Sequence, residues 1–67
     1  MTISINHQPQ ELPDKSTVSA ALQIIGINSF NGVAVAINNH ILKKEEWNSH
    51  ELSPQDTVVL IRASQGG

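Results

Sequence analysis

The stretch Val33-Ala34-Val35-Ala36-Ile37 alternates large and small apolar side chains, and it constrains the fold more than any other segment. Since successive side chains of a strand point to opposite faces, Val33, Val35 and Ile37 share one face while Ala34 and Ala36 share the other. The bulky face is suited to packing against a helix. The nearly flat face is suited to contact with a partner.

A second alternating stretch stands at the start of the chain. Residues 2–6 alternate polar and apolar side chains and predict a half-buried strand with Ile3 and Ile5 inward. His7-Gln8-Pro9 then predicts a turn and Gln10-Glu11-Leu12 a short second strand, so the two strands would form a hairpin.

A helix is expected after this hairpin, from Val18 to Ile25, with Ser16 or Thr17 as its N-cap. Gly26 is suited to the left-handed conformation that ends helices. Ile27 or Phe30 would fold back over the core. The helix should lie across the sheet through one apolar face, made of Val18, Ala21, Leu22 and Ile25.

The remaining segments predict two turns, a short strand, a helical turn and a last strand. Asparagine tolerates positive φ, so 38–40 should turn the chain into a short return strand at Ile41-Leu42. Residues 43–47 should form a helical turn, with Trp47 as a packing residue rather than a binding platform. After a turn at 52–56, the β-branched and aliphatic run 57–62 predicts a buried strand.

The order strand, strand, helix, strand, short strand, strand, with the first and last strands central, predicts a β-grasp fold. This is an α+β architecture in which a mixed sheet of four to five strands packs on one main helix. We expect a single domain over residues 1–67, with a flexible C-terminal tail at 64–67.

Length and composition exclude several functions. A chain of 67 residues has a small core, so an enzyme with its own enclosed pocket is not expected. Four Lys or Arg and a net charge of −2 argue against nucleic acid as a partner. The absence of cysteine excludes a disulfide, a thiol nucleophile and a cysteine zinc site. With no leader and no long apolar run, we expect a cytoplasmic protein that does not bind membranes and is a monomer when free.

The histidines and acidic residues do not form a convincing site. His7, His40 and His50 lie on separate predicted turns without the spacing of metal ligands. Ser49-His50-Glu51 has the residue types of a catalytic triad, but sequence neighbours do not normally form its geometry. We therefore expect these residues on the solvated surface and no bound metal or cofactor.

The strongest candidate site combines the end of the last strand with the Gly-Gly after it. If Val58 and Leu60 face the helix, Val59 and Ile61 point outward beside Ala34 and Ala36 and form an apolar patch. The segment Ser64-Gln65-Gly66-Gly67 would then extend from this patch, and its two Cβ-free residues suit a narrow channel in a partner. The competing interpretations are a frayed tail or an arbitrarily cut chain.

This pattern resembles the ubiquitin-like sulfur carriers, most closely the ThiS family of thiamine biosynthesis. The resemblance covers the whole chain. It rests on the order and spacing of Ile3-Ser4-Ile5-Asn6, Thr17-Val18 with Leu22, residues 33–38, Ile41 with Trp47, Leu52, Asp56 and Gly66-Gly67. Asn39 and Lys43-Lys44 depart from the pattern in loops that would contact a partner.

The resemblance implies that a ThiF-like enzyme uses ATP to adenylate the carboxylate of Gly67. A sulfur donor such as a persulfide enzyme would then convert it to a thiocarboxylate, which would deliver sulfur to a ThiG-like thiazole synthase. The chemistry is consistent, because an ionised carboxylate resists nucleophiles until it carries a leaving group. Three alternatives remain open: a molybdopterin-type sulfur carrier, a protein modifier joined to lysines through Gly67, and a plain interaction module.

Overall fold

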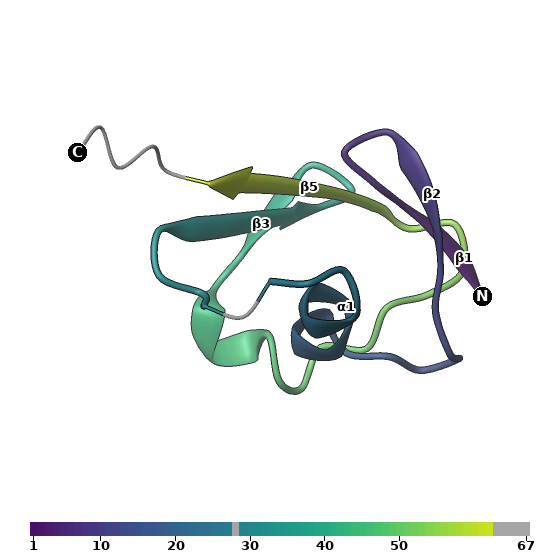
Figure 1. Cartoon of the computed structure of the whole chain (residues 1–67), viewed down its shortest axis with the longest axis horizontal. Helices are drawn as coiled ribbons and strands as arrows, with labels where there is room; N and C mark the ends of the chain where they lie inside the picture. The colour runs from purple at the N-terminus through teal and green to yellow at the C-terminus, as the bar shows by residue number, and fades with distance from the viewer. Residues whose placement is uncertain (28, 63–67) are drawn as a thin grey trace.

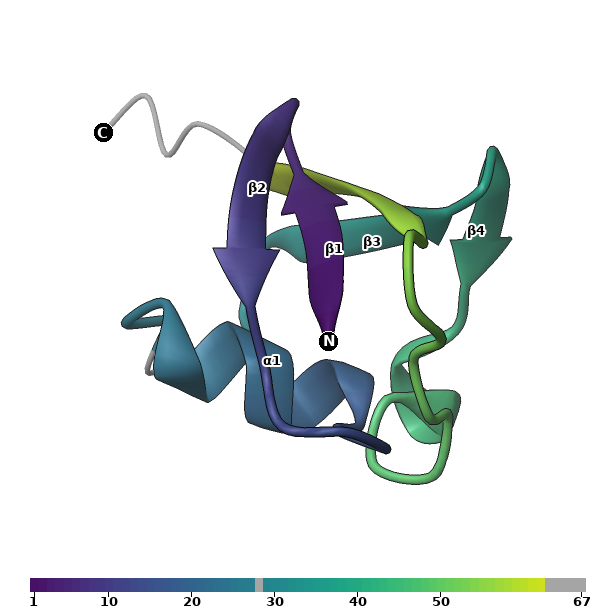
Figure 2. The same cartoon turned by 90° about the vertical axis from the view of Figure 1, so that its right-hand side faces the viewer.

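The computed structural model describes residues 1–27 and 29–62. Within them, five strands form one mixed sheet in the order β2-β1-β5-β3-β4, in which β1 and β5 are parallel and the other neighbours antiparallel. Both helices of the described chain lie on the same side of this sheet (Figures 1 and 2). The predicted β-grasp fold is thus confirmed. Its elements are β1 (Thr2–Ile5), β2 (Gln8–Glu11), α1 (Val18–Ile24), β3 (Val33–Ile37), β4 (His40–Leu42), the 3-10 helix η1 (Lys44–Glu46) and β5 (Thr57–Arg62).

The start of α1 has all of its first N–H donors satisfied. The Oγ1 of Thr17 accepts from the Ala20 N–H at 3.2 Å, so Thr17 is the N-cap. The N–H groups of Val18 and Ser19 donate to the carbonyls of His50 (3.1 Å) and Trp47 (3.0 Å). These donors have no partner within a helix, so the bonds to the later loop satisfy them and fasten α1 in place.

The end of α1 follows from Gly26, as predicted. Gly26 has φ +95°, a conformation that residues with a Cβ rarely adopt. Its N–H donates to the Gln23 carbonyl at 3.1 Å, and the Ile27 N–H donates to the Leu22 carbonyl at 2.8 Å, which together form a Schellman motif. The motif turns Ile27 back into the core, where it is buried.

The core lies between the sheet and α1. The bulky side chains of β3 are all buried, and Val35 is fully inaccessible, which confirms the predicted alternation. Trp47 is also buried and packs edge to face against Phe30, with ring centroids 5.2 Å apart. Its Nε1 donates to the Leu42 carbonyl at 3.1 Å, so its prediction as a packing residue is confirmed.

The first hairpin differs from the prediction. Its turn is Asn6-His7, with φ 52° and 68°, and not His7-Gln8-Pro9. Two consecutive positive φ values are typical of a two-residue type I′ hairpin turn. Pro9 lies within β2, opposite Ser4, where it is tolerated because β2 is an edge strand.

The second hairpin has the same design. Asn38 and Asn39 have φ 50° and 71°, and His40 already belongs to β4 rather than to the turn.

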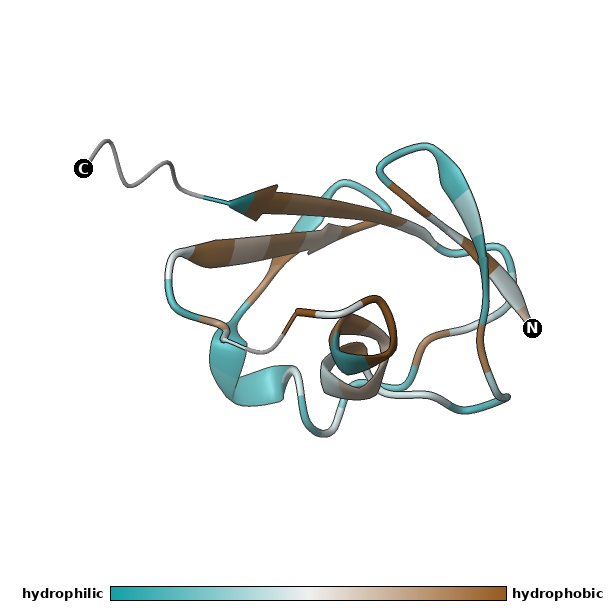
Figure 3. Cartoon of the chain, in the orientation of Figure 1, coloured by the Kyte–Doolittle hydropathy of each residue, from teal (hydrophilic) through white to brown (hydrophobic). Residues whose placement is uncertain are grey.

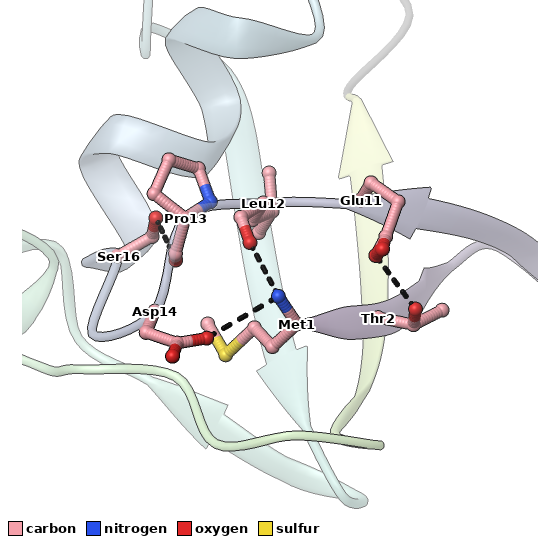
Figure 4. A network of polar contacts seen from close by, with 7 residues as sticks. All are labelled: Met1, Thr2, Glu11, Leu12, Pro13, Asp14 and Ser16. Atoms are coloured by element: carbon pink, nitrogen blue, oxygen red, sulfur yellow. Dashed lines mark hydrogen bonds and ion pairs between the residues drawn. The ribbon is translucent and has the colours of Figure 1, made fainter.

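A polar network closes the other end of the first hairpin (Figure 4). The amino group of Met1 donates to the Leu12 carbonyl at 2.6 Å and lies 3.3 Å from a carboxylate oxygen of Asp14. The Leu12 N–H returns a bond to the Met1 carbonyl at 2.9 Å. Because the Asp14 side chain is largely exposed, the ion pair itself contributes little, and the two backbone bonds join β1 to the segment before α1.

We predict that Leu22→Ala removes most of the stability of the fold. Leu22 is 1% exposed, and a buried Leu→Ala change costs about 2–5 kcal/mol, whereas a core of this size supplies only about 3–5 kcal/mol. The control is Ile24→Ala on the same helix, because Ile24 is 49% exposed and should cost less than about 1 kcal/mol. Urea unfolding measures both; equal losses would contradict the described packing of α1.

Candidate functional site

The register between β3 and β5 brings together the four residues that the sequence suggested as a patch. Ala34 lies opposite Ile61, and Ala36 lies opposite Val59. Directly opposed residues of an antiparallel pair point to the same face, and here that face is the one turned away from α1. The predicted arrangement is therefore present, while its role in binding a partner stays a prediction.

A fifth residue, which the sequence did not assign to this surface, joins it from β4. Ile41 lies opposite Ala36 and is 70% exposed. The signal was the Asn38-Asn39 turn, because a two-residue turn fixes the register of the strands it joins. We call the resulting surface the outer patch: Ala34, Ala36, Ile41, Val59 and Ile61.

The outer patch is accessible although most of it lies on β5 and β3, which are inner strands of the sheet. Ile61 is 52% exposed, whereas Val58, its near neighbour on the other face of β5, is 3% exposed. Figure 3 shows apolar residues along β3 and β5, at the heart of the sheet. Large exposed apolar side chains gathered on one face of a small protein are typical of a contact surface.

The edge of β5 carries a feature that the sequence analysis missed. β1 pairs with β5 at Ser4 and Ile5 and ends there, although β5 continues to Arg62. Beyond that point the side chain of Asn6 takes over. Its Oδ1 accepts from the Leu60 N–H at 2.8 Å, and its Nδ2 donates to the Leu60 carbonyl at 3.2 Å.

A similar contact fastens the beginning of β5 from the opposite edge. The Oδ1 of Asn38 accepts from the Thr57 N–H at 3.0 Å, and its Nδ2 donates to the Asp56 carboxylate at 3.1 Å. The other carboxylate oxygen of Asp56 accepts from the Ser53 N–H at 2.8 Å. The first residue of each hairpin turn thus holds β5 through its carboxamide.

The tail predicted to carry the chemistry lies outside the described residues. This applies to Ser64, Gln65, Gly66 and Gly67, so their proposed roles stay predictions. What the structure does place is the strand that leads to them. β5 ends at Arg62, and its arrowhead lies at the opposite end of the long axis from the N-terminus (Figure 1).

The other candidate residues form no second site in the described part of the chain. His7 and His40 are exposed and His50 is partly buried, and no group of three or more His, Cys, Asp or Glu among residues 1–27 and 29–62 could hold a metal ion. A shallow hollow of about 350 Å³ lies beside β4 and is bordered by His40, His50 and Asp56. The Asp56 carboxylate accepts one hydrogen bond on each oxygen, from the Asn38 side chain and from the Ser53 N–H. No helix in the described ranges is long and apolar enough to cross a membrane.

The fold and the outer patch together define a small ubiquitin-like β-grasp protein with one uncovered sheet face. The chain belongs to the ThiS family, whose model matches residues 3–67. Members of this family are small sulfur carriers that interact with adenylating enzymes and thiazole synthases.

Two solved structures support the fold. The chain is similar to the crystal structure of a thiamine biosynthesis protein (ThiS) from Geobacter metallireducens, with a TM-score of 0.84, 20% identity and 100% of each chain covered. It is also similar to the solution NMR structure of a thiamine biosynthesis protein from Geobacter metallireducens, with a TM-score of 0.77, 20% identity and coverage of 100% of this chain and 88% of that one. At this identity the likeness shows the fold alone. Among curated proteins, none matches.

We predict that the two faces of β5 respond differently to the same substitution. Ile61→Gln should change the free energy of unfolding by less than about 1 kcal/mol, because its side chain is already half exposed. Val58→Gln should cost more than about 2 kcal/mol, because it buries an amide without a partner. Urea unfolding measures both variants. A loss at Ile61 as large as that at Val58 would show that the outer patch is covered.

Proposed function

We propose that this protein carries sulfur on the C-terminal carboxylate of Gly67 for thiazole formation in thiamine biosynthesis. A ThiF-like enzyme binds the outer patch and consumes ATP: a Gly67 carboxylate oxygen attacks the α-phosphate, and pyrophosphate leaves. The terminal sulfur of a persulfide then attacks the acyl carbon and AMP leaves, which gives an acyl disulfide. A second thiol attacks the S–S bond of this intermediate, so that the thiocarboxylate is released and the two thiols of the sulfur-donating partner are left as a disulfide. A persulfide enzyme supplies the sulfur, and a ThiG-like thiazole synthase accepts it in the cytoplasm.

The observation that carries this proposal is the position of β5. One strand contributes Val59 and Ile61 to the exposed patch and leads directly toward residues 63–67. A partner that binds the outer patch therefore contacts the strand that residues 63–67 follow in sequence. The membership in the ThiS family supports the same function.

The chemistry indicates which step the partner performs and what the carrier contributes. A carboxylate is a poor electrophile, and adenylation replaces its oxygen by a good leaving group. We assign ATP binding to the partner, so this protein acts as a substrate and binds no cofactor of its own. The described residues then have one role in this function, which is to present the tail to the partner.

We predict that incubation with ATP, a ThiF-like enzyme and sulfide produces a thiocarboxylate at Gly67. The chain has no cysteine, so a thiol-alkylating reagent should modify the C-terminus only, and fragmentation of the intact protein should locate the adduct at Gly67. The chain without Gly66-Gly67 is the control and should fold normally but stay unlabelled. Linkage of Gly67 to lysines would instead indicate a protein modifier, and labelling of the truncated chain would refute the proposal.

The outer patch gives a second prediction. Ile61→Gln should raise the KM of the adenylating enzyme for the carrier about tenfold, since burying an isoleucine stabilises a complex by roughly 1.5–3 kcal/mol. Ile24→Gln is the matched control, because Ile24 is exposed to a similar degree but lies on α1, across the sheet from the patch. Steady-state kinetics of pyrophosphate release measure both. Equal KM values for the two variants would show that the outer patch is not part of the interface with the adenylating enzyme.

A further inference from the structure

The contact between Asn6 and Leu60 joins residues 54 positions apart and extends the sheet beyond the end of β1. The backbone N–H of Asn6 donates to the Val58 carbonyl at 2.9 Å, as the next residue of a parallel strand would. Its carboxamide then offers one acceptor and one donor to the two backbone groups of Leu60. The side chain thus substitutes for a peptide group at the position where β1 turns away.

The direction of the backbone groups in β5 explains why this substitution matters. Asn38 donates to the Thr57 carbonyl from the β3 side, and Val59 and Ile61 follow Thr57 at intervals of two. The backbone N–H and C=O groups of Thr57, Val59 and Ile61 therefore point toward β3. Those of Leu60, which lies between Val59 and Ile61, point toward the β1 side. Without Asn6, the sheet would hold the last part of β5 from one edge only.

The turn conformation does not by itself require asparagine. Asn6 has φ 52°, a region that glycine adopts more easily. The side chain of Asn6 is exposed and adds no apolar area to the core. Its structural contribution in the described chain is therefore the pair of hydrogen bonds to Leu60.

We propose that Asn6 is a positioning residue for the activation of the C-terminal carboxylate, an inference that rests on the proposed function. Asn6 keeps β5 extended past Leu60, so that the segment after Arg62 starts from a fixed point beside Val59 and Ile61. A partner must engage the outer patch and the terminal carboxylate at once. Each residue of β5 that had to be ordered during binding would weaken the complex roughly tenfold.

The test is Asn6→Gly, because glycine adopts the turn conformation readily and lacks the carboxamide. Amide hydrogen exchange at Leu60 should accelerate at least about tenfold, since this N–H loses its acceptor. In ATP–pyrophosphate exchange with the ThiF-like enzyme, the KM for the carrier should rise about tenfold while kcat changes less than about twofold. This split is expected when a substitution affects binding and not the chemical step.

The matched control is Asn38→Gly. Asn38 has nearly the same φ, 50°, occupies the same place in the other hairpin turn and also bonds the backbone of β5, but at its first residue. This variant should lower the stability of the fold and leave the KM of the folded protein unchanged. If Asn6→Gly does not fold, Asn6→Asp serves instead: its carboxylate still accepts from the Leu60 N–H but cannot donate to the Leu60 carbonyl, and the KM should rise above that of the unaltered chain while kcat changes less than about twofold.

Each contrary outcome has a distinct meaning. A raised KM with unchanged Leu60 exchange would make Asn6 a direct contact of the partner and overturn the positioning role. Faster exchange with an unchanged KM would show that order at the end of β5 does not affect activation, which also overturns it. An equal rise of the KM in Asn38→Gly would show that any loss of sheet stability weakens binding, and this would overturn a specific role of Asn6. If the unaltered chain supports no ATP–pyrophosphate exchange, the proposed function itself fails, and this inference fails with it.

Discussion

Backbone hydrogen bonding on both edges of β5 is the constraint on which the rest of the molecule depends. β5 joins β1 in parallel and β3 in antiparallel, and so links the two hairpins into one sheet. Its inward residue Val58 lies in the core, while Val59 and Ile61 lie on the outer patch. The core and the outer patch therefore share one strand, and a shift in its register would displace both.

The uncovered face of the sheet follows from the small size of the chain. With one main helix, the described residues cover one side of the sheet and leave the other open. The outward positions of β3 are the small residues Ala34 and Ala36, whereas its inward positions are bulky. The small side chains limit the apolar area that is exposed on the open face. Ile41 and Ile61, at 70% and 52% exposure, stand on either side of them. Such a flat surface with larger side chains at its borders is suited to contact with another protein.

Most of the fold could be predicted from the sequence because its signals are local. The alternation in β3, the cap at Thr17 and the stop at Gly26 each act within a few residues. The first turn was placed wrongly because Pro9 suggests a turn, and only the position of β2 at the sheet edge shows why proline fits a strand there. The hydrogen bonds between the Asn6 side chain and Leu60 could not be predicted, because they depend on where β1 ends relative to a strand at the far end of the sequence.

The choice of residues in the two turns is consistent with the role of Asn6 and Asn38, whose side chains hydrogen-bond the backbone of β5. Both turns need positive φ at two positions, which glycine would satisfy with less strain. Within the described chain, the first position of each turn uses its carboxamide on β5, whereas His7 and Asn39 at the second positions make no side-chain hydrogen bond. Asparagine combines tolerance of this conformation with a donor and an acceptor. Asparagine at the first position thus both adopts the turn conformation and hydrogen-bonds β5. The bonds of Asn6 are made near the end of β5 that leads to the tail.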